Sequence, residues 1–303
     1  MRTPRISLEN SVREDGTANR RWTAGIAVSI GARAAGDLAR RELPLTRDAE
    51  AWLGVLTGAV PLVEVRGGEL AALLGVAPLD ARVVAGNRGS SDGFGWVPDH
   101  IGINVQALAD TYGPPDREAT DRAVRIVAHE YIHLLTYAFF PDHRERRRTP
   151  LDRALCTLFF EGLGDYVSVS RRWLPDAEGT ASPAAADALR RLEPILVERL
   201  EQFVDADDER EKALRAGISM GRFDEKWGSL PVALWLHSEV KRCGEAATLR
   251  TILHLERDGV LLLAERHAAP ALQPRIRALH DRIDRARTAA APTATCLAHR
   301  RRP

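Results

Sequence analysis

Two histidines four residues apart, His129 and His133, are the clearest indication of chemistry in this sequence. They belong to the segment HEYIH, inside a run from residue 116 to 140 without proline or glycine. Its apolar residues recur every three or four positions, which predicts a helix. Residues four apart lie on the same face of a helix, so both imidazoles can reach one metal ion. Glu130 points about 100° away from His129, so the pattern predicts two metal ligands and, in Glu130, a general base that activates water.

A third ligand is expected from a second helix, which begins with Thr149 as N-cap and Pro150 as first helical residue. Glu161 lies 28 residues beyond His133, and Asp165 follows one helical turn later on the same face. An unpaired carboxylate among the apolar neighbours of Glu161 would be costly, which favours Glu161 as a metal ligand. Asp165 would then hydrogen-bond the outer nitrogen of a ligand histidine and fix its orientation. The main alternative is that Asp165 is the ligand in place of Glu161.

Two glycines, Gly162 and Gly164, lie between these carboxylates. A glycine inside a helix costs roughly 1 kcal/mol relative to alanine, so two of them in three positions need a reason. The best reason is a close approach of this helix to another one. We therefore expect the acidic face to lie against the histidine helix, where Glu161 would complete a site for one zinc ion per chain.

The segments HEYIH and FFEGLGDYVS together resemble the gluzincin class of zinc metallopeptidases, in which a downstream glutamate completes an HExxH helix. The resemblance implies zinc-dependent hydrolysis of a peptide or protein substrate, with Zn²⁺ as cofactor and an edge strand before the metal helix. Gluzincins commonly stabilise the oxyanion with a downstream tyrosine or histidine. The candidates here are His237, which fits a buried core residue equally well, and Tyr166. The alternative is a non-catalytic protein that has a zincin-like fold and binds peptides or other partners.

The segment before the histidine helix predicts a small sheet. Residues 82–85 (RVVA) are typical of a strand, and the Gly/Ser-rich segment GNRGSSDGFGW that follows them indicates a loop. From residue 100 to 108 apolar residues alternate with small or polar ones, which predicts a half-buried strand at the sheet edge. A peptide substrate could pair with this edge at Gly102 and Asn104, although an ordinary edge strand explains the pattern equally well.

The bulk composition limits the possible classes of protein. The 303 residues include 43 Lys+Arg and 42 Asp+Glu, so nothing demands a nucleic-acid partner. No apolar segment approaches the ~18 residues of a membrane span, and acidic residues near the N-terminus are unlike a signal peptide, so a cytoplasmic protein is expected rather than a secreted one. The three cysteines are too few and too scattered for a disulfide framework.

The expected fold is α+β and mostly α, with a small N-terminal sheet, an edge strand next to the HExxH helix and a helical C-terminal half. Residues 1–115 would form an N-terminal α/β region with short helices at 48–56 and 69–74. Residues 116–289 would form the helical metallopeptidase region, and residues 290–303 a disordered tail. The pattern does not indicate an oligomeric state.

Overall fold

The computed structural model describes residues 2–12, 20–30, 44–88, 92–96, 98–140, 149–174 and 182–290. Along the chain the elements are β1 (Ile6–Asn10), α1 (Arg20–Ile30), α3 (Arg47–Leu74), β2 (Ala81–Gly86), β3 (Gly93–Trp96), β4 (His100–Asn104), α4 (Val105–Tyr112), α5 (Ala119–Phe139), α6 (Pro150–Ser168), η1 (Arg171–Trp173), α7 (Pro183–Phe203), α8 (Asp208–Leu214), η2 (Phe223–Glu225), α9 (Ser229–Cys243), α10 (Glu245–Leu255), α11 (Arg257–His267) and α12 (Gln273–Ala290). The prediction of an α+β, mostly α protein is therefore confirmed. The expected tail lies, from residue 291 onward, outside the described residues.

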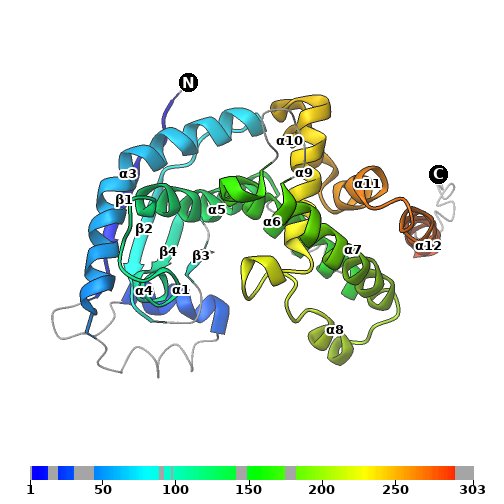
Figure 1. Cartoon of the computed structure of the whole chain (residues 1–303), viewed down its shortest axis with the longest axis horizontal. Helices are drawn as coiled ribbons and strands as arrows, with labels where there is room; N and C mark the ends of the chain where they lie inside the picture. Colours follow the sequence, from blue (N-terminus) through cyan, green and yellow to red (C-terminus); the bar gives the residue numbers. More distant parts are fainter. Residues whose placement is uncertain are drawn as a thin grey trace, which may run out of the picture.

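The helices α5 and α6 lie in the middle of the molecule. Figure 1 shows the sheet with α1, α3 and α4 at one end, and α7 to α12 at the other. One hydrophobic core cluster extends across both ends, from Ile6 in β1 to Ile283 in α12. The two central helices are thus held by apolar packing on several sides, which fixes the positions of the side chains that they carry.

The sheet has four strands in the order β1-β2-β4-β3. Strands β1, β2 and β4 are parallel, and β3 pairs with β4 in the antiparallel sense. The prediction that the strand starting at His100 is the edge is wrong, because β4 has a partner on each side. The two edge strands are β1 and β3, and β3 comes from the segment that we expected to be a loop, although its sequence GFGW has the two-residue alternation of a strand.

The strand expected at residues 100–108 is only partly correct. β4 ends at Asn104, and α4 begins at Val105. The Asn104 side chain accepts a hydrogen bond from the backbone nitrogen of Ala107, so this residue is the N-cap of α4. An asparagine side chain that satisfies an otherwise unpaired helical N–H strongly favours the start of a helix. The chain therefore turns into a helix after Asn104, although the alternating pattern continues beyond it.

The two short helices predicted at 48–56 and 69–74 are in fact one helix of 28 residues, α3. Its interior contains Pro61, which a helix tolerates when packing on its other faces compensates for the lost hydrogen bond. One face of α3 is buried along its whole length, and a Cβ at Gly67 would lie only 3.0 Å from the Tyr131 ring of α5. Close contact with α5 therefore keeps the helix continuous.

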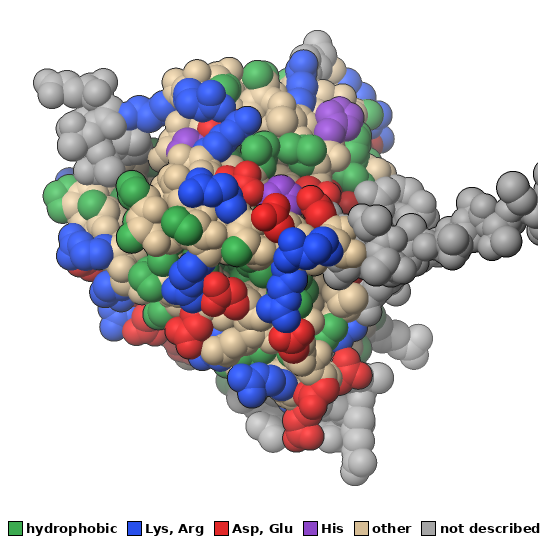
Figure 2. Space-filling model, turned by 90° about the vertical axis from the view of Figure 1, so that its right-hand side faces the viewer, with side chains coloured by type: hydrophobic (Ala, Val, Ile, Leu, Met, Phe, Trp, Pro, Cys, Tyr) green, Lys and Arg blue, Asp and Glu red, His purple; other side chains and the backbone are tan. Residues whose placement is uncertain are grey.

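The outer surface carries mixed charge. On the face that Figure 2 shows, basic and acidic side chains are interspersed, in keeping with their nearly equal totals. In the part of the chain that the structure describes, none of the helices is both long and apolar enough to cross a membrane.

Candidate metal centre

The histidine helix α5 is anchored on the face opposite its histidines. The Tyr131 hydroxyl accepts a hydrogen bond from the Leu79 backbone nitrogen at 2.9 Å and donates one to the Leu79 carbonyl at 2.8 Å. Tyr131 itself is fully buried against α3. With this side fixed, His129 and His133 point toward α6, one turn apart, with their ring centroids 4.8 Å from each other. The i, i+4 spacing thus places both imidazoles in one location, as the pattern predicts.

Three side chains from two helices converge beside α5. One ligand atom from each of His129, His133 and Glu161 can be chosen so that all three lie within 4.8 Å of one another. The distance from His129 Nε2 to Glu161 Oε2 is 3.6 Å. Two imidazole nitrogens and one carboxylate oxygen are a donor set that zinc takes in catalytic sites. This grouping is the one that the sequence predicts.

The two glycines of α6 allow the helices to come together. A Cβ on Gly164 would lie 2.6 Å from Nε2 and Cε1 of His129, and one on Gly162 would lie 2.5 Å from Cγ1 of Val232 in α9. Both distances are too short for real atoms, so each position needs glycine unless the neighbour moves. The prediction that these glycines mark a close helix approach is confirmed, and Gly164 approaches the first histidine itself.

Asp165 lies on the other side of the His129 ring from Glu161. Its Oδ1 is 3.6 Å from His129 Nδ1, which is also 3.3 Å from the Ser168 hydroxyl oxygen. The Asp165 side chain is fully buried, with the Lys226 ammonium 3.0 Å from Oδ1 and the Ser229 hydroxyl donating to Oδ2 at 2.5 Å. Of the two alternatives for the third ligand, the geometry favours Glu161, because Asp165 faces the nitrogen that points away from the convergence point.

Burial and mutual charge set the pKa values of the group. Burial alone lowers the pKa of His129, but the hydrogen bond to Glu161 and the nearby carboxylates outweigh it and raise the pKa to about 9. Burial raises the pKa of Glu161, yet the hydrogen bond with His129 and the charge of His133 bring it down to about 2. Burial lowers the pKa of His133 to about 4. It raises the pKa of Glu130 to about 7. Perturbed pKa values of this kind cluster at functional sites.

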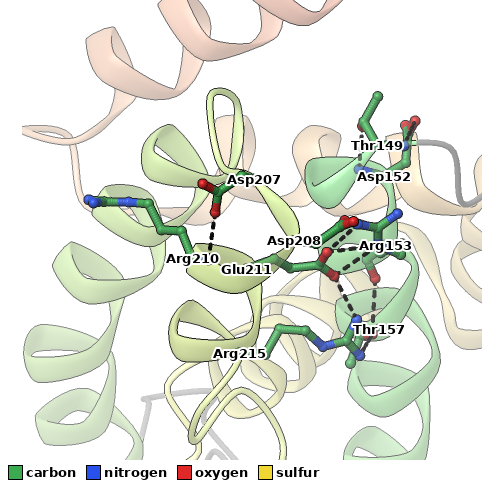
Figure 3. Close-up of polar contacts among 9 residues, drawn as sticks. All are labelled: Thr149, Asp152, Arg153, Thr157, Asp207, Asp208, Arg210, Glu211 and Arg215. Carbon is green, nitrogen blue, oxygen red and sulfur yellow. Dashed lines mark hydrogen bonds and ion pairs between the residues drawn. The ribbon is translucent and has the colours of Figure 1, made fainter.

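The first half of α6 is fixed by its cap and by α8. Thr149 and Asp152 form a capping box, and Pro150 is at the start of the helix, as predicted. Figure 3 shows how Arg153 and Thr157 of α6 join to α8: Glu211 accepts from Arg153 at 2.9 Å, and Arg215 binds both Glu211 and Thr157. These contacts lie one to two turns before Glu161 and hold the helix that carries it.

The edge strand β3 lies directly against Glu130. A Cβ on Gly93 would be 2.9 Å from Glu130 Oε1, and one on Gly95 would be 3.6 Å from Oε2. Glycine at position 93 therefore allows the strand to approach the carboxylate, whereas a Cβ at position 95 would make an ordinary contact with it. The sequence pattern did not indicate this strand, and no motif marks Lys226, which lies in a loop.

Four of the predicted site residues are placed elsewhere. The Tyr166 hydroxyl donates to Glu245 at 2.9 Å, and its ring packs on His237 with centroids 4.3 Å apart. Neither side chain belongs to the converging group, and these contacts do not support the oxyanion role that we predicted for them. The substrate-binding prediction for Gly102 and Asn104 is wrong, because both lie on the interior strand β4, where Gly102 pairs with Val84 and with Phe94 and Asn104 is buried as a helix cap.

Comparisons of the chain with protein-family models, with curated proteins and with solved structures give no match.

Proposed function

We propose that this chain is a zinc-dependent peptidase of the gluzincin type, with a zincin-like arrangement of its sheet edge and its two central helices. The observation that carries the proposal is the convergence of His129, His133 and Glu161 within 4.8 Å of one another, with Glu130 next to them on α5. The three side chains come from positions 129 to 161, on two separate helices. A general base and an open metal position are what metal-assisted hydrolysis requires.

The residues present fit a zinc ion. His133 has a low pKa and is neutral near pH 7, and Glu161 is ionised, so both are in the form that binds metal. The raised pKa of His129 favours a protonated imidazole near pH 7, and a metal cation would replace that proton. Around the group stand the carboxyl groups of Glu130, Glu161 and Asp165, whose negative charge the protonated His129 and Lys226 offset only in part. A divalent cation would offset the remaining negative charge.

In the proposed mechanism, His129, His133 and Glu161 would hold a zinc ion, which would supply Lewis-acid polarisation of the scissile carbonyl and of the attacking water. Glu130 accepts the proton of that water on its carboxylate and later delivers it to the leaving amine. Asp165 faces Nδ1 of the His129 ring and would help to keep Nε2 turned toward Glu161.

Two variants test this proposal. Glu130→Gln keeps the size of the side chain and removes the base, so it should retain zinc and lose peptide hydrolysis by at least ~100-fold. His133→Ala removes a ligand, so it should lose zinc as measured by elemental analysis after purification without chelator. Normal turnover by Glu130→Gln, or full zinc occupancy in His133→Ala, would refute the assignment.

A second candidate is a non-catalytic peptide-binding protein with the same fold. The observation in its favour is the placement of Tyr166 and His237. Tyr166 donates a hydrogen bond to Glu245 and packs on the His237 ring, and neither belongs to the group of His129, His133 and Glu161. A zinc-loaded wild-type protein that binds peptides from a random library but cleaves none of them would favour this candidate over the peptidase.

A further inference from the structure

A partly buried lysine lies beside the proposed metal centre. Lys226 is one of three lysines in the chain, and its side chain is 16% exposed. Its ammonium lies 3.0 Å from Oδ1 of Asp165, which is fully buried. Asp165 Oδ1 is in turn 3.6 Å from Nδ1 of His129. One carboxylate oxygen thus faces both the lysine and a proposed zinc ligand.

The loop that carries Lys226 is firmly attached to the protein. The backbone nitrogens of Trp227 and Gly228 donate to the carbonyls of Gly217 and Ile218, both at 3.1 Å. The Trp227 indole donates to the Ala216 carbonyl at 2.6 Å. A Cβ on Gly228 would lie 2.5 Å from Leu158 of α6, so the loop is pressed against the helix of Glu161. The ammonium is therefore positioned by the fold and is not a mobile surface charge.

The charge of Lys226 matches its surroundings. Burial lowers the pKa of Lys226, but the carboxylates of Asp165, Glu161 and Asp92 outweigh it and raise the pKa, so the side chain stays charged. A buried carboxylate with its cation removed is left with an uncompensated charge, which is strongly unfavourable in a dry site. Asp165 would then shift toward the Ser229 hydroxyl or another partner, and the Nδ1 of His129 would keep only the Ser168 hydroxyl, 3.3 Å away, as its polar neighbour of these two.

We propose that Lys226 is a positioning residue of the metal centre: its ammonium fixes Asp165, and Asp165 in turn keeps the His129 ring oriented with Nε2 toward the metal. The inference rests on the proposed function for its zinc ion. Groups that orient metal ligands from outside typically change metal affinity by about 10–100-fold when they are removed. Lys226 acts through Asp165 and touches neither substrate nor metal.

The test measures zinc affinity by competition with a chelator, in protein of full length. Lys226→Met keeps the length of the side chain and removes its charge, and it should weaken zinc binding by about 10–100-fold. Lys226→Arg restores the charge and should recover most of that loss. Lys212→Met is the control for charge removal, because Lys212 is exposed on α8. Trp227→Phe is the control for the loop, because it removes the bond to Ala216 and leaves the ammonium in place.

Zinc affinity of Lys226→Met equal to that of the wild type would overturn the inference. So would equal losses in Lys226→Met and Lys226→Arg, because the role depends on charge, or an equal loss in Trp227→Phe, which would indicate a general effect of the loop. A purely structural lysine would lower stability in all loop variants without this pattern.

A second measurement separates this inference from the proposed function. If the wild-type protein binds no zinc, the proposed function is refuted. The positioning role of Lys226 is then tested in the zinc-free proteins. The ¹⁵N resonance of His129 Nδ1, assigned by its absence in His129→Gln, should shift in Lys226→Met and stay unchanged in Lys212→Met. An unchanged His129 resonance in Lys226→Met would overturn the positioning role.

Discussion

Replacing Gly164 with alanine should displace the ring of His129, a proposed metal ligand, with little effect on the stability of the fold. The added Cβ would lie 2.6 Å from the His129 ring, about 0.8 Å inside an ordinary contact distance. Zinc–nitrogen distances tolerate a deviation of only about 0.2 Å, so a ring displaced by this amount no longer ligates well. We expect zinc affinity to fall by about 100-fold, at the upper end of the effect of disturbing a ligand's support.

The expected change in stability is small because two effects oppose each other. Overpacking costs typically ~1–3 kcal/mol, whereas alanine in place of a helical glycine contributes roughly 1 kcal/mol. The net destabilisation of about 0–2 kcal/mol leaves the protein folded at 25 °C. Zinc affinity by chelator competition and urea unfolding followed by circular dichroism measure the two quantities separately.

Two glycine variants serve as controls. Gly162→Ala makes a similar collision in the same helix, but with Val232 of α9 rather than with a ligand, so zinc affinity should change much less. Gly58→Ala lies on the exposed face of α3, where a Cβ would meet nothing within 4 Å among the described residues, so it measures the propensity gain alone. A folded Gly164→Ala protein that binds zinc within threefold of wild type would refute the reasoning, as would an equal loss in Gly162→Ala.

Three further predictions follow from the charges and the packing. Because the pKa of His129 is about 9, zinc binding at pH 7.5 should release about one proton, measured by calorimetry in buffers of different ionisation enthalpy, and the release should fall to about half a proton near pH 9; no release at pH 7.5 would contradict the prediction. Hydrogen bonding to Arg242, opposed by burial and aided by His267, lowers the pKa of Glu239 to about 2, so its contribution to stability is present above pH 4.5 and is lost as the pH falls toward 2. The difference in urea midpoint between wild type and Glu239→Gln should therefore shrink below pH 4.5, and a constant difference would count against this. Finally, chelation of zinc should lower the melting temperature only as far as the lost binding free energy accounts for, and unfolding should stay cooperative. Loss of the helical circular-dichroism signal at 25 °C after chelation would contradict this prediction.

Local spacing was enough to predict the core of the site. The i, i+4 histidines, the carboxylate at Glu161 and the costly glycines between the carboxylates each constrain the structure through a single helix. Gly164 was the most informative residue. A glycine inside a helix that no turn or cap explains indicates close contact with another element, and the residue in contact here is His129. These inferences needed no knowledge of the overall chain path.

The misassigned parts depend on contacts between distant segments. Nothing in the local sequence of β4 marks it as an interior strand, because the strand order depends on how the whole sheet assembles. The strand at the edge next to β4 is β3. α3 continues through Pro61 because α5 packs along it. Lys226 reaches Asp165 from 61 residues away, through a loop whose shape depends on Trp227 and Gly228. The position of Tyr166 follows from its hydrogen bond to Glu245, which lies on another helix.

The same packing implies an order of events for the site. α5 is held by the Tyr131 hydroxyl on one side, and α6 by its cap and by the Arg153–Glu211 contacts, so both helices have their positions without help from a metal. His129 Nε2 and Glu161 Oε2 lie 3.6 Å apart, and the nearby carboxylates raise the pKa of His129 to about 9. Under the proposed function, a cation would therefore exchange with the imidazole proton in a prearranged set of ligands and would not have to gather them. Such prearrangement would cost little reorganisation on binding, which is the condition under which the partly buried Lys226 behind Asp165 can affect metal affinity.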